Sequence, residues 1–143
     1  MILMIIASLI DFHVASCQDN KAKPTFELQT FSDFPKDIDG CSCYFSKNDK
    51  DFKNQLYFFV NDFASLAYVK VKSQFVKLDL VNSSKDKTSK SFYEYKSKDF
   101  KLRIDIVSSK PSGGEASKLT GKLTITFKNG EKLVLDFVGE CGC

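Results

Sequence analysis

The chain has 143 residues, of which 43% are apolar and 27% charged, a size and composition typical of one compact domain. Lys and Arg number 21 and Asp and Glu 18, so the net charge of +3 is too small to indicate binding to nucleic acid. Arg103 is the sole arginine, and the forked guanidinium is the usual means of holding a phosphate or carboxylate in a fixed orientation. The composition therefore favours one ordinary globular domain and argues against a nucleic-acid partner.

The N-terminal segment has the pattern of an export signal. Residues 1–10 are apolar with small residues among them, and small residues at positions 15 and 16 precede the polar run 18–21. An apolar stretch of this length is too short to span a bilayer and is typical of a secretory signal peptide. We expect residues 1–16 to be removed on export.

The residues Val14, Ala15, Ser16 and Cys17 match the lipobox of bacterial lipoproteins: an aliphatic residue, two small residues and the acylated cysteine. The chain resembles small bacterial lipoproteins in this motif, and the resemblance implies that Cys17 carries lipid and begins the mature protein. Several acyl chains would hold the protein on a membrane almost permanently.

Residues 17–25 are then the acylated cysteine and a polar tether, and residues 26–143 form a single domain. Gln18 does not resemble the acidic retention signal of inner-membrane lipoproteins, which favours the outer membrane of a bacterial cell envelope. Two alternatives remain open at this stage: plain secretion with Cys17 unmodified, and an unprocessed N-terminus.

The other four cysteines occur as two C-x-C pairs, Cys41 with Cys43 and Cys141 with Cys143. A bridge within one pair would close a strained ring, so the pairs are expected to bridge to each other. Alternate side chains share a face of a strand. An antiparallel arrangement would join Cys41 to Cys143 and Cys43 to Cys141, and a parallel one would exchange the partners.

Two alternatives use the same four thiols. A four-thiolate site would bind a soft metal ion, although zinc sites favour two or more residues between paired cysteines. A redox-active dithiol is the other alternative. Export to an oxidising compartment favours structural disulfides.

Alternating apolar and polar residues predict β-strands. The pattern is clearest in 100–106 and 76–80, and again in 119–127 and 133–137. The last two segments flank Asn129-Gly130 and are expected to form a hairpin with a three-residue loop, Lys128 to Gly130, in which Gly130 is left-handed. Gly121 would then face Phe137, whose ring covers the missing side chain.

Weaker strand candidates are 26–31, 41–45, 56–60, 67–72 and 92–96, and the run 56–60 is apolar on both faces, as in a strand that is buried on both sides. Eight or nine strands with short turns indicate an antiparallel meander. If the first and last strands are bridged, the sheet closes on itself. The predicted fold is an all-β closed barrel, lipocalin-like, or a tight sandwich.

The sequence offers little for catalysis. His13 is the only histidine and lies in the segment expected to be removed, so the mature domain has no imidazole for a catalytic triad. Asp33, Asp37 and Asp39 precede the first C-x-C pair, but the spacing of a calcium loop is missing and solvated loop acids are expected. We therefore expect a protein that is not an enzyme and has neither a cofactor nor a bound metal.

One segment has the composition of a partner surface. Lys90, Phe92, Tyr93, Tyr95 and Lys96 combine lysines with aromatic rings, as do surfaces that bind glycans or single strands. The alternative is a solvated loop that leads into an ordinary strand.

The function expected from the sequence is an exported, lipid-anchored, non-catalytic binding module of the bacterial cell envelope. The membrane is one partner, through the lipid anchor. A protein, a glycan or a small apolar ligand inside the barrel is the other. The alternative function is that of a metal-binding or redox protein that uses the two C-x-C pairs.

Overall fold

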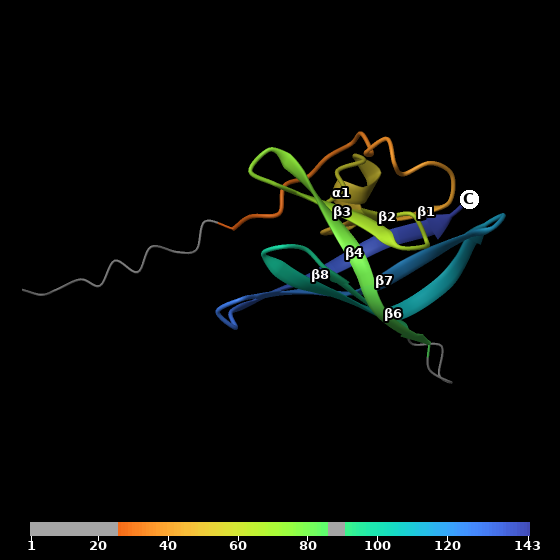
Figure 1. Cartoon of the computed structure of the whole chain (residues 1–143). Coiled ribbons are helices and arrows are strands. Elements are labelled where there is room, and N and C mark those ends of the chain that lie inside the picture. Colours follow the sequence, from red (N-terminus) through yellow and green to blue (C-terminus); the bar gives the residue numbers. More distant parts are fainter. Residues whose placement is uncertain (1–25, 86–90) are drawn as a thin grey trace, which may run out of the picture.

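The computed structural model describes residues 26–85 and 91–143, which form a closed antiparallel β-barrel (Figure 1). Consecutive strands pair with each other, and the first strand also pairs with the last, so the sheet has no free edge. The predicted all-β fold is confirmed, and of the two alternatives, barrel and sandwich, the structure has the barrel. The elements are β1 (Ser42–Ser46), α1 (Asp49–Lys53), β2 (Phe59–Asn61), β3 (Leu66–Val71), β4 (Gln74–Lys85), β5 (Ser91–Lys96), β6 (Phe100–Gly113), β7 (Ala116–Phe127) and β8 (Lys132–Gly142).

The hairpin β7–β8 follows the prediction closely. The amide of Phe127 donates to the carbonyl of Glu131, and Gly130 has a φ of 85°, which makes the loop three residues long with a left-handed glycine. Gly121 pairs with Phe137, and a Cβ at position 121 would lie 2.7 Å from Cζ of that ring. The absence of a side chain at Gly121 therefore makes room for the phenylalanine.

Stacked aromatic rings fill the centre of the barrel. Phe45 lies between Phe59 and Phe137, with ring centroids 5.0 and 4.1 Å away. A Cβ at Gly139, on the neighbouring strand, would collide with the ring of Phe45. Aromatic side chains bury large areas and dominate the energetics of a core, so these rings fix the packing between β1, β2 and β8.

The two ends of the barrel differ. We call the end that carries the turns β3–β4, β5–β6 and β7–β8 the base, and the opposite end, where β1 begins and β8 ends, the mouth (left and right in Figure 1). At the base, the ring of Phe26 packs edge-on against Phe100 and Phe127, with centroids 5.3 and 4.8 Å away. The base is thus closed by side chains from the start of the described chain.

The predicted strand 26–31 is wrong. This segment makes only two isolated bridges, Gln29 with Lys70 and Phe31 with Tyr57. β4 pairs with the whole of β3 and the short β2 pairs with its middle, so only the end of β3 is left for another partner. The chain then continues along the outside of the barrel, where Phe31 packs with Val60 and Tyr68. The hydroxyl of Tyr68 donates to Asp37 at 2.6 Å.

This outer layer explains the apolar run that precedes the second strand. Phe58, Phe59 and Val60 are fully buried, as the pattern predicts, but the strand itself is shorter than expected and covers only Phe59–Asn61. A five-residue helix, α1, lies before it, capped by Asn48, whose side chain accepts the amide of Asp51 at 2.9 Å. Periodicity over a dozen residues cannot reveal a helix of this length.

Candidate functional site: the cavity at the mouth of the barrel

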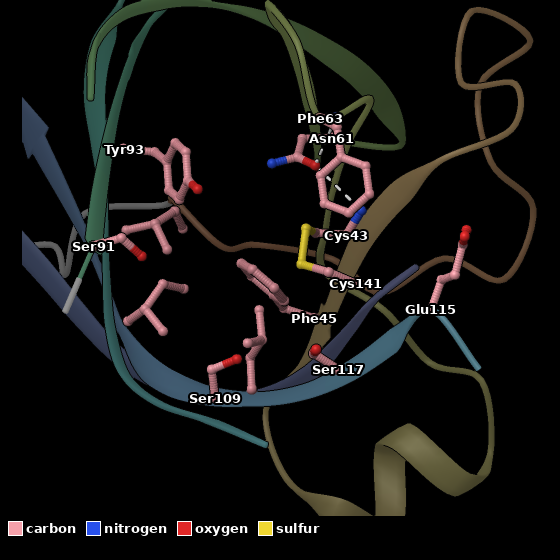
Figure 2. A pocket seen from close by; sticks show the side chains of 13 residues that line it. Cys43, Phe45, Asn61, Phe63, Ser91, Tyr93, Ser109, Glu115, Ser117 and Cys141 are labelled. Atoms are coloured by element: carbon pink, nitrogen blue, oxygen red, sulfur yellow. Dashed lines mark hydrogen bonds between the residues drawn. A yellow bond between two sulfur atoms is a disulfide. The ribbon is translucent and has the colours of Figure 1, made fainter. Parts of the chain in front are cut away.

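A cavity of about 490 Å³ opens at the mouth of the barrel (Figure 2). Its volume lies within the range of small-molecule sites. The deeper wall is apolar and the upper wall is polar. The apolar wall comprises Phe45, Ile104, Ile106 and Leu119, and the polar positions are Asn61, Ser91, Tyr93, Ser109, Glu115 and Ser117.

The arrangement follows from strand alternation. Ser117 and Leu119 share a face of β7, so both point inward. Ser117 is the second residue of β7 and lies nearer the mouth than Leu119. The serines thus form a polar collar above the apolar wall. Glu115 lies on the turn between β6 and β7, at the rim. The cavity can hold a molecule whose apolar part lies deep and whose polar part lies near the rim.

The disulfide Cys43–Cys141 forms part of the cavity wall, and Cys41–Cys143 lies beyond it toward the end of the strands. The antiparallel pairing of β1 with β8 sets these partners, because Cys43 stands directly opposite Cys141. Of the connectivities open from the sequence, the structure has the antiparallel one. Both bridges join β1 to β8, where the barrel closes. They contribute to the stability of the fold mainly by constraining the unfolded chain.

The disulfides also indicate where the protein works. Disulfides persist in oxidising compartments outside the cytoplasm, and an extracytoplasmic location follows. In this oxidised form none of the four sulfur atoms is a thiolate, which is the form that a metal ligand or a reactive thiol requires.

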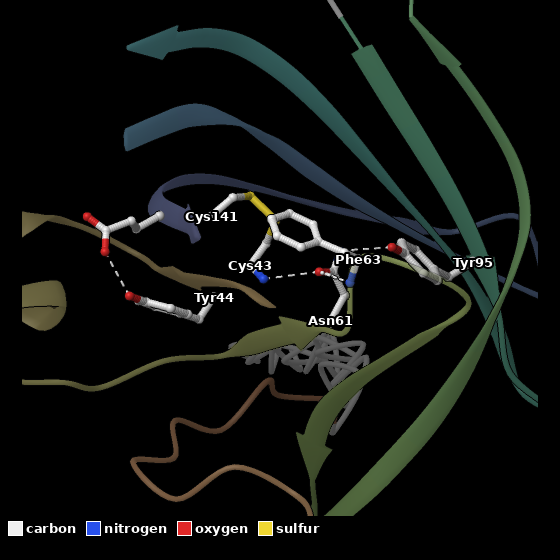
Figure 3. Close-up of a disulfide and its surroundings, with 7 residues drawn as sticks. Cys43, Tyr44, Asn61, Phe63, Tyr95 and Cys141 are labelled. Carbon is white, nitrogen blue, oxygen red and sulfur yellow. Dashed lines mark hydrogen bonds between the residues drawn. A yellow bond between two sulfur atoms is a disulfide. The ribbon is translucent and has the colours of Figure 1, made fainter. Parts of the chain in front are cut away.

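Asn61 is the polar centre beneath the rim (Figure 3). It is only 6% exposed. Its Oδ1 accepts the amides of Cys43 and Phe63, each at 3.2 Å, and its Nδ2 donates to the hydroxyl of Tyr95 at 3.0 Å. One side chain therefore connects the bridged strand β1, the loop after β2, and β5.

Phe63 stands at the rim of the cavity with half of its surface exposed, and its φ of 65° is unusual for a bulky residue. Strained backbone of this kind persists only where the surroundings enforce it. The hydrogen bond from its amide to Asn61 does so here. An exposed ring in this position offers apolar area to a molecule that enters the cavity.

The four described residues of the predicted partner surface do not lie together. Tyr93 faces the cavity, and Tyr95 is buried within the barrel, where burial raises its pKa from 10.0 to about 12. Phe92 packs on the outside beneath the guanidinium of Arg103, 4.0 Å from its ring centroid, and Lys96 is exposed at the base. Lys90 and the lipidation residue Cys17 lie outside the described residues.

The sequence interpretation missed several residues that shape the cavity, among them Asn61, Phe63 and Ser117. The parity of Ser117 with Leu119 was a usable signal for an inward position. Asn61 directly follows the apolar run 56–60, and nothing in its neighbours indicates that its polar side chain is buried.

The described part of the chain contains no histidine, and residues 26–85 and 91–143 hold no group of three or more His, Cys, Asp or Glu side chains placed to bind a metal ion. Within the same residues no helix combines the length and the apolar character needed to cross a bilayer. Comparison with protein-family models, with curated proteins and with solved structures finds no match to this chain.

Proposed function

We propose that this protein is an exported, lipid-anchored binding module of the bacterial cell envelope whose barrel holds a small amphiphilic molecule. The observation that carries the proposal is the two-zone cavity at the mouth, with an apolar wall below a polar collar. The lipobox supports the anchor, and the disulfides fit the oxidising space outside the cytoplasm.

The interior of the barrel is filled by side chains below the cavity. Phe26, Phe100 and Phe127 close the base, and Phe45 and its stacked neighbours fill the middle. The space above these rings opens at the mouth. A ligand therefore enters from there with its apolar part first, since that part removes the deep wall from water.

The collar sets the chemistry of the other end of the ligand. Serine hydroxyls both donate and accept hydrogen bonds, and Glu115 adds one negative charge at the rim. A neutral hydroxyl-bearing or amide-bearing head group suits these positions. A long-chain alcohol or a monoacylglycerol represents this class.

The test is native mass spectrometry of the full chain released from detergent micelles, with a monoacylglycerol or a long-chain alcohol added. We expect a one-to-one complex with either compound and none with a disaccharide. The Ser117→Phe variant fills the cavity and should weaken the complex roughly tenfold, which corresponds to about 1.4 kcal/mol. The neighbouring Lys118→Phe variant places the same ring outside the barrel and is the matched control.

Two results would contradict the cavity as a binding site. One is equal complex formation by the Ser117→Phe and Lys118→Phe variants, which would locate binding elsewhere. The other is a complex with neither amphiphile while the barrel remains folded by circular dichroism.

The alternative proposal of a metal-binding or redox protein uses the same four cysteines. It requires the two bridges to open by uptake of two electrons and two protons each. A stoichiometric soft metal in protein purified without oxygen would favour this alternative over a binding module held by structural disulfides.

A further inference from the structure

The base of the barrel is ringed by lysines. They come from every connection at this end: the end of β1, the turns β3–β4, β5–β6 and β7–β8, and the strand ends beside them (Figure 1). The residues are Lys47, Lys70, Lys72, Lys96, Lys98, Lys101, Lys128 and Lys132, and the carboxylates at this end are Glu27, Asp99 and Glu131. Positive charge therefore predominates at the base.

These lysines are available to an external partner. The ion pairs of the described residues involve other basic side chains, namely Lys77, Arg103, Lys118 and Lys122. None of the eight base lysines takes part in an ion pair within 26–85 and 91–143. Seven of them are exposed, and Lys70 is partly covered and lies over the ring of Phe75.

The described chain also starts at the base. Phe26 packs against Phe100 and Phe127 at this end, and Cys17 precedes it by nine residues. Nine residues span at most about 30 Å. A lipid on Cys17 would therefore keep the base within about 30 Å of the bilayer, but it would not by itself fix which end of the barrel lies on the surface.

We infer that the lysine-ringed base lies on an anionic membrane surface and that the cavity mouth points away from it. The inference rests on the proposed lipid anchor. An anionic surface attracts each nearby lysine enough to change the partition coefficient roughly fivefold. At the other end of the described barrel the carboxylates Asp39, Asp62, Glu115 and Glu140 outnumber the lysines Lys110 and Lys118, so this end is less attracted to an anionic surface than the base.

The sequence contains no tryptophan, so a single introduced tryptophan is the sole source of tryptophan fluorescence and can report the orientation of the barrel. The acylated full chain is reconstituted in phosphatidylglycerol vesicles with brominated acyl chains, which quench tryptophan at short range. The Asn129→Trp variant reports from the β7–β8 turn at the base, and the Ser112→Trp variant reports from the end of β6 near the mouth.

We expect quenching of the Asn129→Trp reporter to exceed that of the Ser112→Trp reporter several-fold. The difference should disappear in phosphatidylcholine vesicles and fall in 1 M salt, where the Debye length is about 3 Å. Adding Lys96→Glu, Lys98→Glu and Lys128→Glu to the Asn129→Trp variant should abolish the excess quenching. The matched control, Lys110→Glu with Lys118→Glu and Lys122→Glu, should leave it unchanged.

Equal quenching of the two reporters in anionic vesicles, or excess quenching that is insensitive to lipid charge and to the base substitutions, would overturn the inference. The mass of the reconstituted protein separates this failure from failure of the proposed function. Acylated protein with equal quenching refutes the orientation alone, whereas protein without lipid refutes the anchor and the orientation with it.

Discussion

The two disulfides form nested loops, and their contributions to stability should therefore be strongly non-additive. Cys41–Cys143 and Cys43–Cys141 join the same two strands, with sequence separations of 102 and 98 residues. Either bridge alone already closes almost the whole barrel. The perturbation is removal of each bridge by paired alanine substitution, and then of both.

The chain-entropy relation gives the magnitudes. Closing a loop of 102 residues contributes about 4.7 kcal/mol. Once one bridge is present, the second closes a ring of only about six residues through the two C-x-C pairs and adds about 2 kcal/mol. Removing either bridge alone should cost about 2 kcal/mol, whereas removing both should cost about 7 kcal/mol.

The free energy of unfolding in urea, measured for the four proteins by circular dichroism, tests this arithmetic. The Cys43→Ala/Cys141→Ala variant should be the less stable of the single-bridge proteins by up to about 1 kcal/mol, because Cys43 is buried and Cys143 is exposed. The reasoning is refuted if the two single-bridge losses add up to the double loss within about 0.5 kcal/mol, as independent sites would.

Three further predictions concern the interior. Asn61→Ala should cost about 2 to 4 kcal/mol in urea unfolding, because the buried amide of Cys43 and the amide of Phe63 lose their acceptor; a loss below about 0.5 kcal/mol would show that water replaces the side chain. Gly121→Ala should lower the free energy of unfolding by about 3 kcal/mol or more, at or above the upper end of the roughly 1 to 3 kcal/mol that is typical of overpacking, since its Cβ would strike the backbone of β6 as well as an aromatic ring. An unchanged unfolding midpoint would count against the close packing there. Burial raises the pKa of Tyr95 from 10.0 to about 12, so the unfolded chain ionises first and the free energy of unfolding should fall by about 2 to 3 kcal/mol between pH 10 and 12. The Tyr95→Phe protein should lack this component of the alkaline decline, and an identical decline in both proteins would contradict it.

Much of the barrel was predictable because its signals are local. The alternation of apolar and polar residues in β6, β7 and β8 predicted which side chains face inward. Asn129-Gly130 predicted the loop that joins the last two strands. The two C-x-C pairs supplied the long-range constraint. If β1 and β8 are neighbours, a meander of eight strands must close.

The remaining features depend on relations between distant residues. Segment 26–31 has the composition of a strand, but whether it pairs depends on whether the sheet has an edge. The cavity exists because the side chains at the mouth are small where those of the middle are large, and this comparison requires the register of eight strands. Asn61 gains its role only once Cys43 and Tyr95 lie on either side of it.

The intact mass of the protein extracted from bacterial membranes tests the central claim most directly, because acylation and the oxidation state of the cysteines appear in the same spectrum. We expect the mass of a chain that begins at Cys17, increased by lipid and reduced by four hydrogens for two disulfides. A chain without lipid, or one with four free thiols, would contradict the account of an anchored barrel closed by oxidised cysteines.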